Sequence, residues 1–144
     1  MTSKWIDRTL ISSPYCIGLC ISEKDFLDEL ERLNVPENDR PYFVQSNKDA
    51  AVHFFKQTDT RNLCALVCIK PRNNKIDPNA LIGLLIHEAD HIWRAICDEL
   101  GETFPSKEFE AYSLQAISQR LIEKYKVLHD ATKIKQKVKR SSNK

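Results

Sequence analysis

The chain has 144 residues, of which 42% are hydrophobic and 29% are charged, a composition typical of a globular domain with one core. No run reaches the roughly 18 continuous apolar residues of a membrane span, so we expect no membrane partner. Six of the 22 basic residues lie in residues 131–144, which contain no acidic residue. Residues 1–130 therefore contain the other 16 basic residues and all 20 acidic residues. We therefore expect a mildly acidic domain, 1–130, and a basic tail, 131–144, either disordered or a frayed helical extension.

The cysteines favour a reducing compartment. Five is an odd number, which suits the cytoplasm better than a disulfide framework. The N-terminal apolar run is interrupted by Ser12, Ser13 and Pro14, so we expect no secretion signal. Cysteines four residues apart, in 16–20 and 64–68, lie in predicted strands, where they are about 13 Å apart. We expect them to be small buried hydrophobes and not zinc ligands.

The first half of the chain predicts three strands and one helix. Residues 15–21 predict a strand, and residues 22–33 predict a helix with Ser22 as N-cap and apolar residues at the helical period. Residues 50–57 and 62–70 predict two strands joined by a short turn, which indicates an antiparallel hairpin. His53 is expected to be an ordinary strand residue.

The second half predicts two long helices. Asp77 is a suitable cap with Pro78 in the first turn, and Gly101 should end this helix after Leu100. The last helix should run from about 106 to 129, which would place His129 at its end, where a positive charge complements the helix dipole. The order β-α-β-β-α-α predicts an α+β fold in which a small antiparallel or mixed sheet packs on these two helices.

The first of these helices carries the motif with the clearest chemistry. His87, Glu88 and His91 form H-E-x-x-H, and on a helix the two histidines point the same way, one turn apart. Such a pair binds zinc, while the glutamate is the general base. The alternative is a hydrogen-bonded pair of histidines without metal. Asp90 is expected to form an ion pair with Arg94 on the helix surface, although a supporting role behind the metal ligands is also open.

Two faces of this helix can be separated by periodicity. A broad apolar face, expected to pack on the sheet, comprises Ile82, Leu85, Ile86, Ala89, Ile92, Trp93, Ile96 and Leu100. A second stripe becomes polar toward its end and comprises Ala80, Leu84, His87, His91, Arg94 and Asp98. The histidines therefore should lie at a boundary where a cleft can open.

A catalytic zinc site needs a third protein ligand, and the last helix offers Glu108 and Glu110. Glu110 continues the inward apolar stripe of Leu114, Ile117 and Leu121, so we favour Glu110 as the ligand. The alternative is an acid in the first turn that complements the helix dipole. Tyr112 is a candidate donor to the developing oxyanion, or else a partly buried aromatic with a hydrogen-bonded hydroxyl.

With these residues identified, the chain resembles the small zinc metallopeptidase family encoded by bacteriophages and prophages. The resemblance rests on "HEADHIW" and "GETFPSKEFEAYSLQAI", and also covers "WIDRTLISSPYCIGLCISEKDF" and "AAVHFFKQ". It implies a minimal zincin-like domain of gluzincin type, in which the glutamate before alanine, here Glu110, is the third ligand. At Leu114 the chain departs from large gluzincins, which have an aspartate there.

Three hypotheses about function follow. The first is a zinc-dependent metallopeptidase in the host cytoplasm that cleaves a protein or peptide substrate, of the host or of the phage, through zinc-activated water. The second is a phage protein that keeps the zincin scaffold but binds and inhibits a host defence or regulatory protein without catalysis. The third is a nucleic-acid-associated protein acting through its tail, which the acidic balance of the domain argues against.

Overall fold

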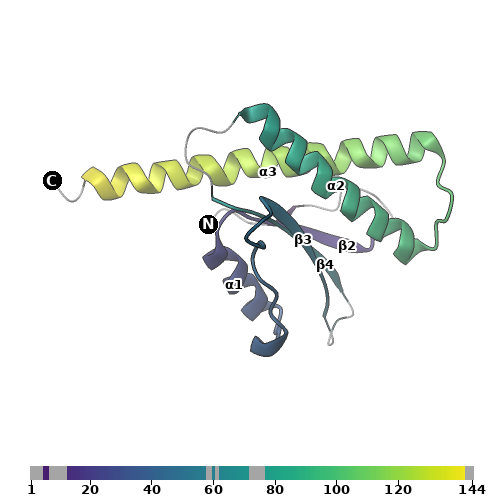
Figure 1. Cartoon of the computed structure of the whole chain (residues 1–144), viewed down its shortest axis with the longest axis horizontal. Helices are drawn as coiled ribbons and strands as arrows, with labels where there is room; N and C mark the ends of the chain where they lie inside the picture. The colour runs from purple at the N-terminus through teal and green to yellow at the C-terminus, as the bar shows by residue number, and fades with distance from the viewer. Residues whose placement is uncertain (1–4, 7–12, 58–59, 61, 72–76, 142–144) are drawn as a thin grey trace.

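The computed structural model describes residues 5–6, 13–57, 60, 62–71 and 77–141, which form a four-stranded sheet and three α-helices. The strands are β1 (Trp5–Ile6), β2 (Tyr15–Cys20), β3 (Ala50–Lys56) and β4 (Leu63–Ile69). The helices are α1 (Glu23–Arg32), α2 (Pro78–Leu100) and α3 (Lys107–Ser141), with a short 3-10 helix at Glu37–Asp39. This arrangement confirms the α+β expectation (Figure 1).

The sheet is mixed, in the order β1-β2-β4-β3. β3 and β4 form the expected antiparallel hairpin, β2 pairs with β4 in parallel, and β1, which was not predicted, pairs antiparallel with β2. β3 is therefore an edge strand of this sheet, and no other described strand pairs with its outer side. The parallel pair β2 and β4 forms the centre.

Alternation along the central strands divides the core into two layers. Ile17 of β2 and Val67 of β4 pack in one cluster with residues of α2 and α3. Cys64 and Leu66 of β4 pack in a second cluster with Phe26 of α1. Because successive side chains of a strand point to opposite faces, the sheet lies between α1 on one side and α2 with α3 on the other (Figure 1).

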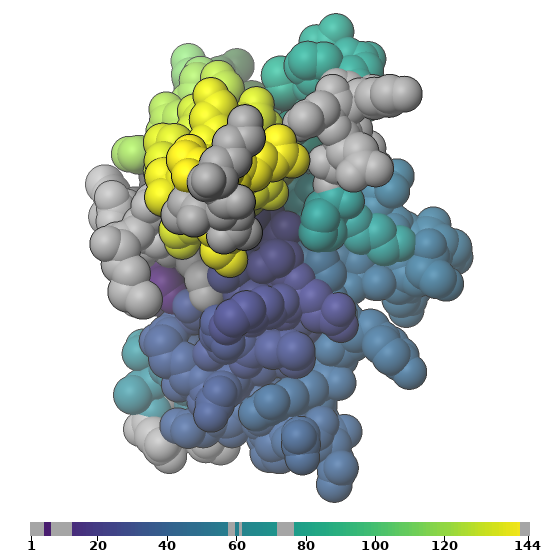
Figure 2. All heavy atoms as spheres, turned by 90° about the vertical axis from the view of Figure 1, so that its left-hand side faces the viewer, coloured from purple at the N-terminus to yellow at the C-terminus, as the bar shows by residue number. Residues whose placement is uncertain are grey.

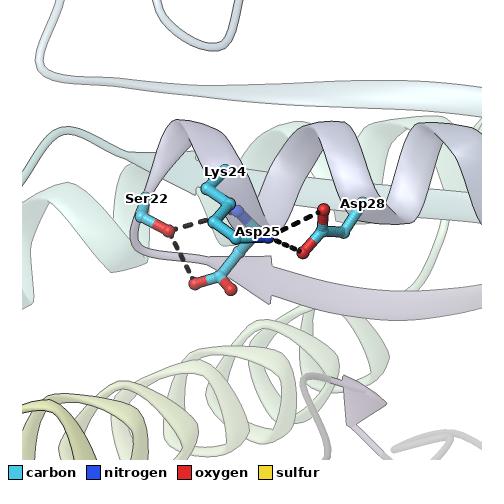
Figure 3. A network of polar contacts seen from close by, with 4 residues as sticks. All are labelled: Ser22, Lys24, Asp25 and Asp28. Carbon is cyan, nitrogen blue, oxygen red and sulfur yellow. Dashed lines mark hydrogen bonds and ion pairs between the residues drawn. The ribbon is translucent and has the colours of Figure 1, made fainter. Parts of the chain in front are cut away.

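The start of α1 agrees with the prediction that Ser22 is its N-cap. Ser22 Oγ accepts a hydrogen bond from the backbone N–H of Asp25 at 3.2 Å and donates one to Asp25 Oδ2 at 2.7 Å. One turn of helix is further linked by Lys24 and Asp28, whose Nζ and Oδ2 are 2.9 Å apart (Figure 3). These contacts satisfy a backbone donor that a helix N-terminus would otherwise leave unpaired.

Both ends of α2 lie where the sequence predicts them. Asp77 accepts a hydrogen bond from the backbone N–H of Asn79 at 2.9 Å, Pro78 is the first helical residue, and Gly101 ends the helix with φ of 71°. The apolar face is narrower than predicted, because Ile82, Ile86 and Leu100 are exposed. The remaining members of that face are all buried, namely Leu85, Ala89, Ile92, Trp93 and Ile96.

The final helix is longer than predicted. It continues to Ser141, so the described part of the basic tail is helical, and His129 lies inside the helix, stacked on Tyr125, and not at its end. The side chains of Ile134 and Val138 are exposed, and this end of α3 extends past the sheet (Figure 1). Figure 2 views the molecule from that end, with the last turns of α3 in yellow above α1.

We find no helix among the described residues that combines the length and the hydropathy needed to cross a membrane.

Candidate metal and catalytic site

The two histidines of the H-E-x-x-H motif converge in space. His87 Nε2 and His91 Nε2 are 3.2 Å apart, and the ring planes are nearly perpendicular, at 89°. Two imidazole nitrogens bound to one tetrahedral zinc at about 2.0–2.1 Å would lie roughly 3.3 Å apart. The spacing therefore fits two ligands of one zinc ion. It also fits a hydrogen bond between the two rings in which one donates and the other accepts.

Both histidines line a cleft of about 790 Å³. One wall is the second stripe of α2, with Leu84, His87, His91, Arg94 and Asp98 all facing the cleft. The opposite wall is formed by β3, which contributes residues 50–52 and 54. The prediction that the histidines lie at the boundary between the core face and a cleft is confirmed, although Ala80, at the start of the stripe, does not line it.

Glu88 contributes a buried carboxyl group to this cleft. Glu88 lines the cleft, although the whole residue is only 4% exposed. Its carboxyl group forms no hydrogen bond or ion pair with another described residue. Burial raises the pKa of the Glu88 carboxyl above the usual range. The neighbouring charges of His91, His87 and Lys48 lower that pKa but do not cancel the effect of burial. A carboxylate with a raised pKa beside two imidazoles is suited to accept a proton near neutral pH.

Glu110 and Glu108 differ as their helical positions predict. Glu110 is half-buried on the side of α3 that faces α2, and its charge acts on Arg94 and on Cys97. Glu108 is exposed. Arg94 is one helical turn beyond His91, and it lines the cleft, whereas Glu110 does not. Among the residues the structure describes, no group of three or more His, Cys, Asp or Glu side chains is close enough to hold a metal.

Tyr112 lies outside the cleft. Its residue is 67% exposed, and it belongs to the same outward stripe as Glu108. The structure therefore does not bring Tyr112 together with the histidines. Asp90 occupies the place expected for a surface acid, because Arg94 Nε donates a hydrogen bond to Asp90 Oδ2 at 2.7 Å.

The cleft also contains residues that the sequence did not single out. Tyr15 of β2 and the adjacent residues Lys48 and Asp49, which precede β3, line it, as does Glu99 of α2. Periodicity within α2 identifies the positions of that helix that share a face. It gives no information about the strand residues opposite, because sheet register and helix packing place them there.

The other histidines and the cysteines do not line the cleft, although the charge of Glu88 acts on Cys68 and that of Glu110 on Cys97. His53 Nε2 is 3.1 Å from the carbonyl oxygen of Phe43, and burial lowers the pKa of its ring. No disulfide joins the five cysteines, and all are buried except Cys16, which is half-buried. Parallel pairing of β2 with β4 places Cys16 beside Cys64 and Cys20 beside Cys68. They occupy strands as predicted.

We compared the chain with models of known protein families, with curated proteins and with solved structures, and none of the three comparisons found a match.

Proposed function

We propose that the protein is a zinc-dependent metallopeptidase with a minimal zincin-like domain, in which Glu88 is the general base. The observation that carries this proposal is the 3.2 Å separation of His87 Nε2 and His91 Nε2 at the edge of a cleft that also contains the buried carboxyl of Glu88. The motif resembles that of phage-encoded metallopeptidases, which supports a protein or peptide substrate. We place its action in the host cytoplasm.

Each side chain has a separate role in this proposal. His87 and His91 hold the metal through Nε2, the atoms that face one another. Zinc supplies Lewis acidity, which polarises a peptide carbonyl and activates water near neutral pH. Glu88 accepts a proton from the attacking water and passes it to the nitrogen of the leaving amine. The depth of Glu88 in the cleft keeps that proton away from bulk solvent.

Glu110 is the third ligand in this proposal. Support comes from its half-buried position opposite α2 and from its electrostatic effect on Arg94, one turn beyond His91. Phe109, its neighbour in α3, packs edge-on against Trp93 with ring centroids 5.1 Å apart, which fixes the first turn of α3 against α2. Glu108, exposed and two residues away, is the matched control for every substitution of Glu110.

The test is proteolysis by the wild type and by Glu88→Gln. Each protein is incubated with a host lysate, and new peptide termini are identified by mass spectrometry. We expect defined termini with the wild type and a loss of at least about 100-fold in their rate of appearance with Glu88→Gln, since general acid–base groups contribute 10²–10⁴-fold. Glu108→Gln should retain the wild-type pattern. Equal cleavage by the wild type and Glu88→Gln would exclude the catalytic role.

A second candidate is a binding protein that keeps the scaffold and inhibits a host protein without catalysis. The specific observation in its favour is that the described residues assemble two histidines but no third metal-binding side chain beside them. This candidate predicts that Glu88→Gln retains full biological effect and that no new peptide termini form. The lysate experiment distinguishes it from the peptidase, because the two candidates predict opposite results for the wild type.

A further inference from the structure

Two acidic residues line one end of the cleft, in a turn of α2 where a negative charge is unfavourable for the helix. Asp98 and Glu99 are both exposed, both line the cleft, and neither forms an ion pair with another residue in the described ranges. They lie in the last turn of α2, which contains no basic residue. The negative end of the helix dipole disfavours carboxylates there. Their presence is not explained by the stability of the helix.

An aromatic pair faces this acidic end from the sheet. Tyr15 of β2 is 8% exposed, and its ring meets that of Phe54 edge-on, with centroids 5.4 Å apart. Both rings line the same cleft. The hydroxyl of Tyr15 forms no hydrogen bond with any residue that the structure describes. Because Tyr15 lines the cleft, this hydroxyl is available to a group that binds there.

The acidic and aromatic residues lie close enough to influence one another. The pKa of the Tyr15 hydroxyl is raised first by burial and then by the negative charges of Glu99 and Asp98. Two basic residues also line the cleft: Arg94 pairs with Asp90, and Lys48 forms no ion pair with Asp98, Glu99 or any other described residue. This end of the cleft therefore combines two carboxylates, an unpaired hydroxyl and aromatic surface.

We propose that Tyr15, Phe54, Asp98 and Glu99 form a subsite that binds the side chain of a lysine or arginine in the polypeptide substrate. Carboxylates form charge-assisted hydrogen bonds with such cations, and aromatic rings stabilise them further. The subsite deepens the proposed peptidase function, on which it rests, by naming a substrate class.

The distance along α2 sets where the basic residue lies in the substrate. Asp98 follows His91 by seven residues, which corresponds to about 10 Å along a helix at 1.5 Å per residue. An extended polypeptide advances about 3.3 Å per residue. The recognised lysine or arginine therefore lies within about three residues of the bond to be cleaved.

The test compares binding of two fluorescein-labelled peptides by anisotropy. Both are eight-residue peptides of glycine, serine and leucine; one has a central arginine and the other a central citrulline, which has the same shape without the charge. We expect the wild type to bind the arginine peptide about tenfold more tightly, as two charge-assisted hydrogen bonds allow. Asp98→Asn/Glu99→Gln should lose this preference.

The control variant is Glu102→Gln/Glu108→Gln, which removes the same charge at two exposed residues that do not line the cleft. It should keep the tenfold preference. The subsite is refuted if the wild type binds both peptides equally, or binds neither, or if the preference survives in Asp98→Asn/Glu99→Gln. Binding needs no turnover, so a preference without any cleavage would refute the peptidase and leave the subsite, whereas cleavage without a preference would do the reverse.

Discussion

Replacing Glu88 by glutamine should stabilise the metal-free protein at neutral pH. The carboxyl is 4% exposed and has no partner among the described residues, and burial raises its pKa. At a pH above that raised value the folded protein must hold a charge that the unfolded chain hydrates. Holding that charge therefore costs the folded protein free energy. Glutamine keeps the shape of the side chain and removes the charge.

The stabilisation by Glu88→Gln and its dependence on pH can both be measured. We expect Glu88→Gln to raise the free energy of unfolding at pH 7 by about 1 kcal/mol, the lower end of the desolvation cost of a buried group without a partner, because the buried amide retains part of that cost. Below the unfolded pKa of about 4.5 the carboxyl is protonated in both states, so the advantage should vanish. Urea unfolding with a chelator at pH 4 and pH 7 gives both values. A variant that is less stable at pH 7, or an advantage unchanged at pH 4, would refute this reasoning.

Two further substitutions test the fold. Gly18→Ala should lower the free energy of unfolding by about 1–3 kcal/mol, since the new Cβ would lie 2.7 Å from Leu66 Cδ2 and 3.1 Å from the Trp5 ring. Gly83→Ala should instead raise it by about 0.5–1 kcal/mol, because a Cβ there meets no atom within 4 Å and alanine favours the helix. Equal effects of the two substitutions in urea unfolding would contradict the packing around Gly18. Burial lowers the pKa of His53, so the folded protein binds this proton more weakly than the unfolded chain, and stability should fall as pH drops below about 6.5. Thermal unfolding from pH 7.5 to 5 should show a shallower decline in His53→Gln, and an unchanged slope would assign the decline to other groups.

The sequence predicts the local features of α2 and fails where long-range packing decides. Asp77, Pro78 and Gly101 act on their own helix, so its bounds follow from residue types alone. The parallel pairing of β2 with β4 depends on which strands meet after folding, and no local signal encodes it. β1 is two residues long, too short for a periodic pattern.

In the candidate site, too, the sequence predicts the residues that share a helix face but not those that distant elements contribute. Helical periodicity correctly places His87 and His91 on the cleft and Glu110 on the inner side of α3. Both expectations for Tyr112, an oxyanion donor and a partly buried aromatic, are wrong, because the residue is 67% exposed and does not line the cleft. Tyr15 reaches the cleft only because β2 lies beneath α2, so its presence required the three-dimensional arrangement.

The central claim is that His87 and His91 bind zinc, and the most direct measurement is the zinc content of the purified protein. We expect about one zinc ion per chain in the wild type and in Glu88→Gln, and a loss of most of it in His91→Ala. Glu110→Ala should weaken zinc retention during dialysis, while Glu108→Ala should not. A wild-type protein that, after incubation with zinc, retains no more metal than His91→Ala would contradict the claim.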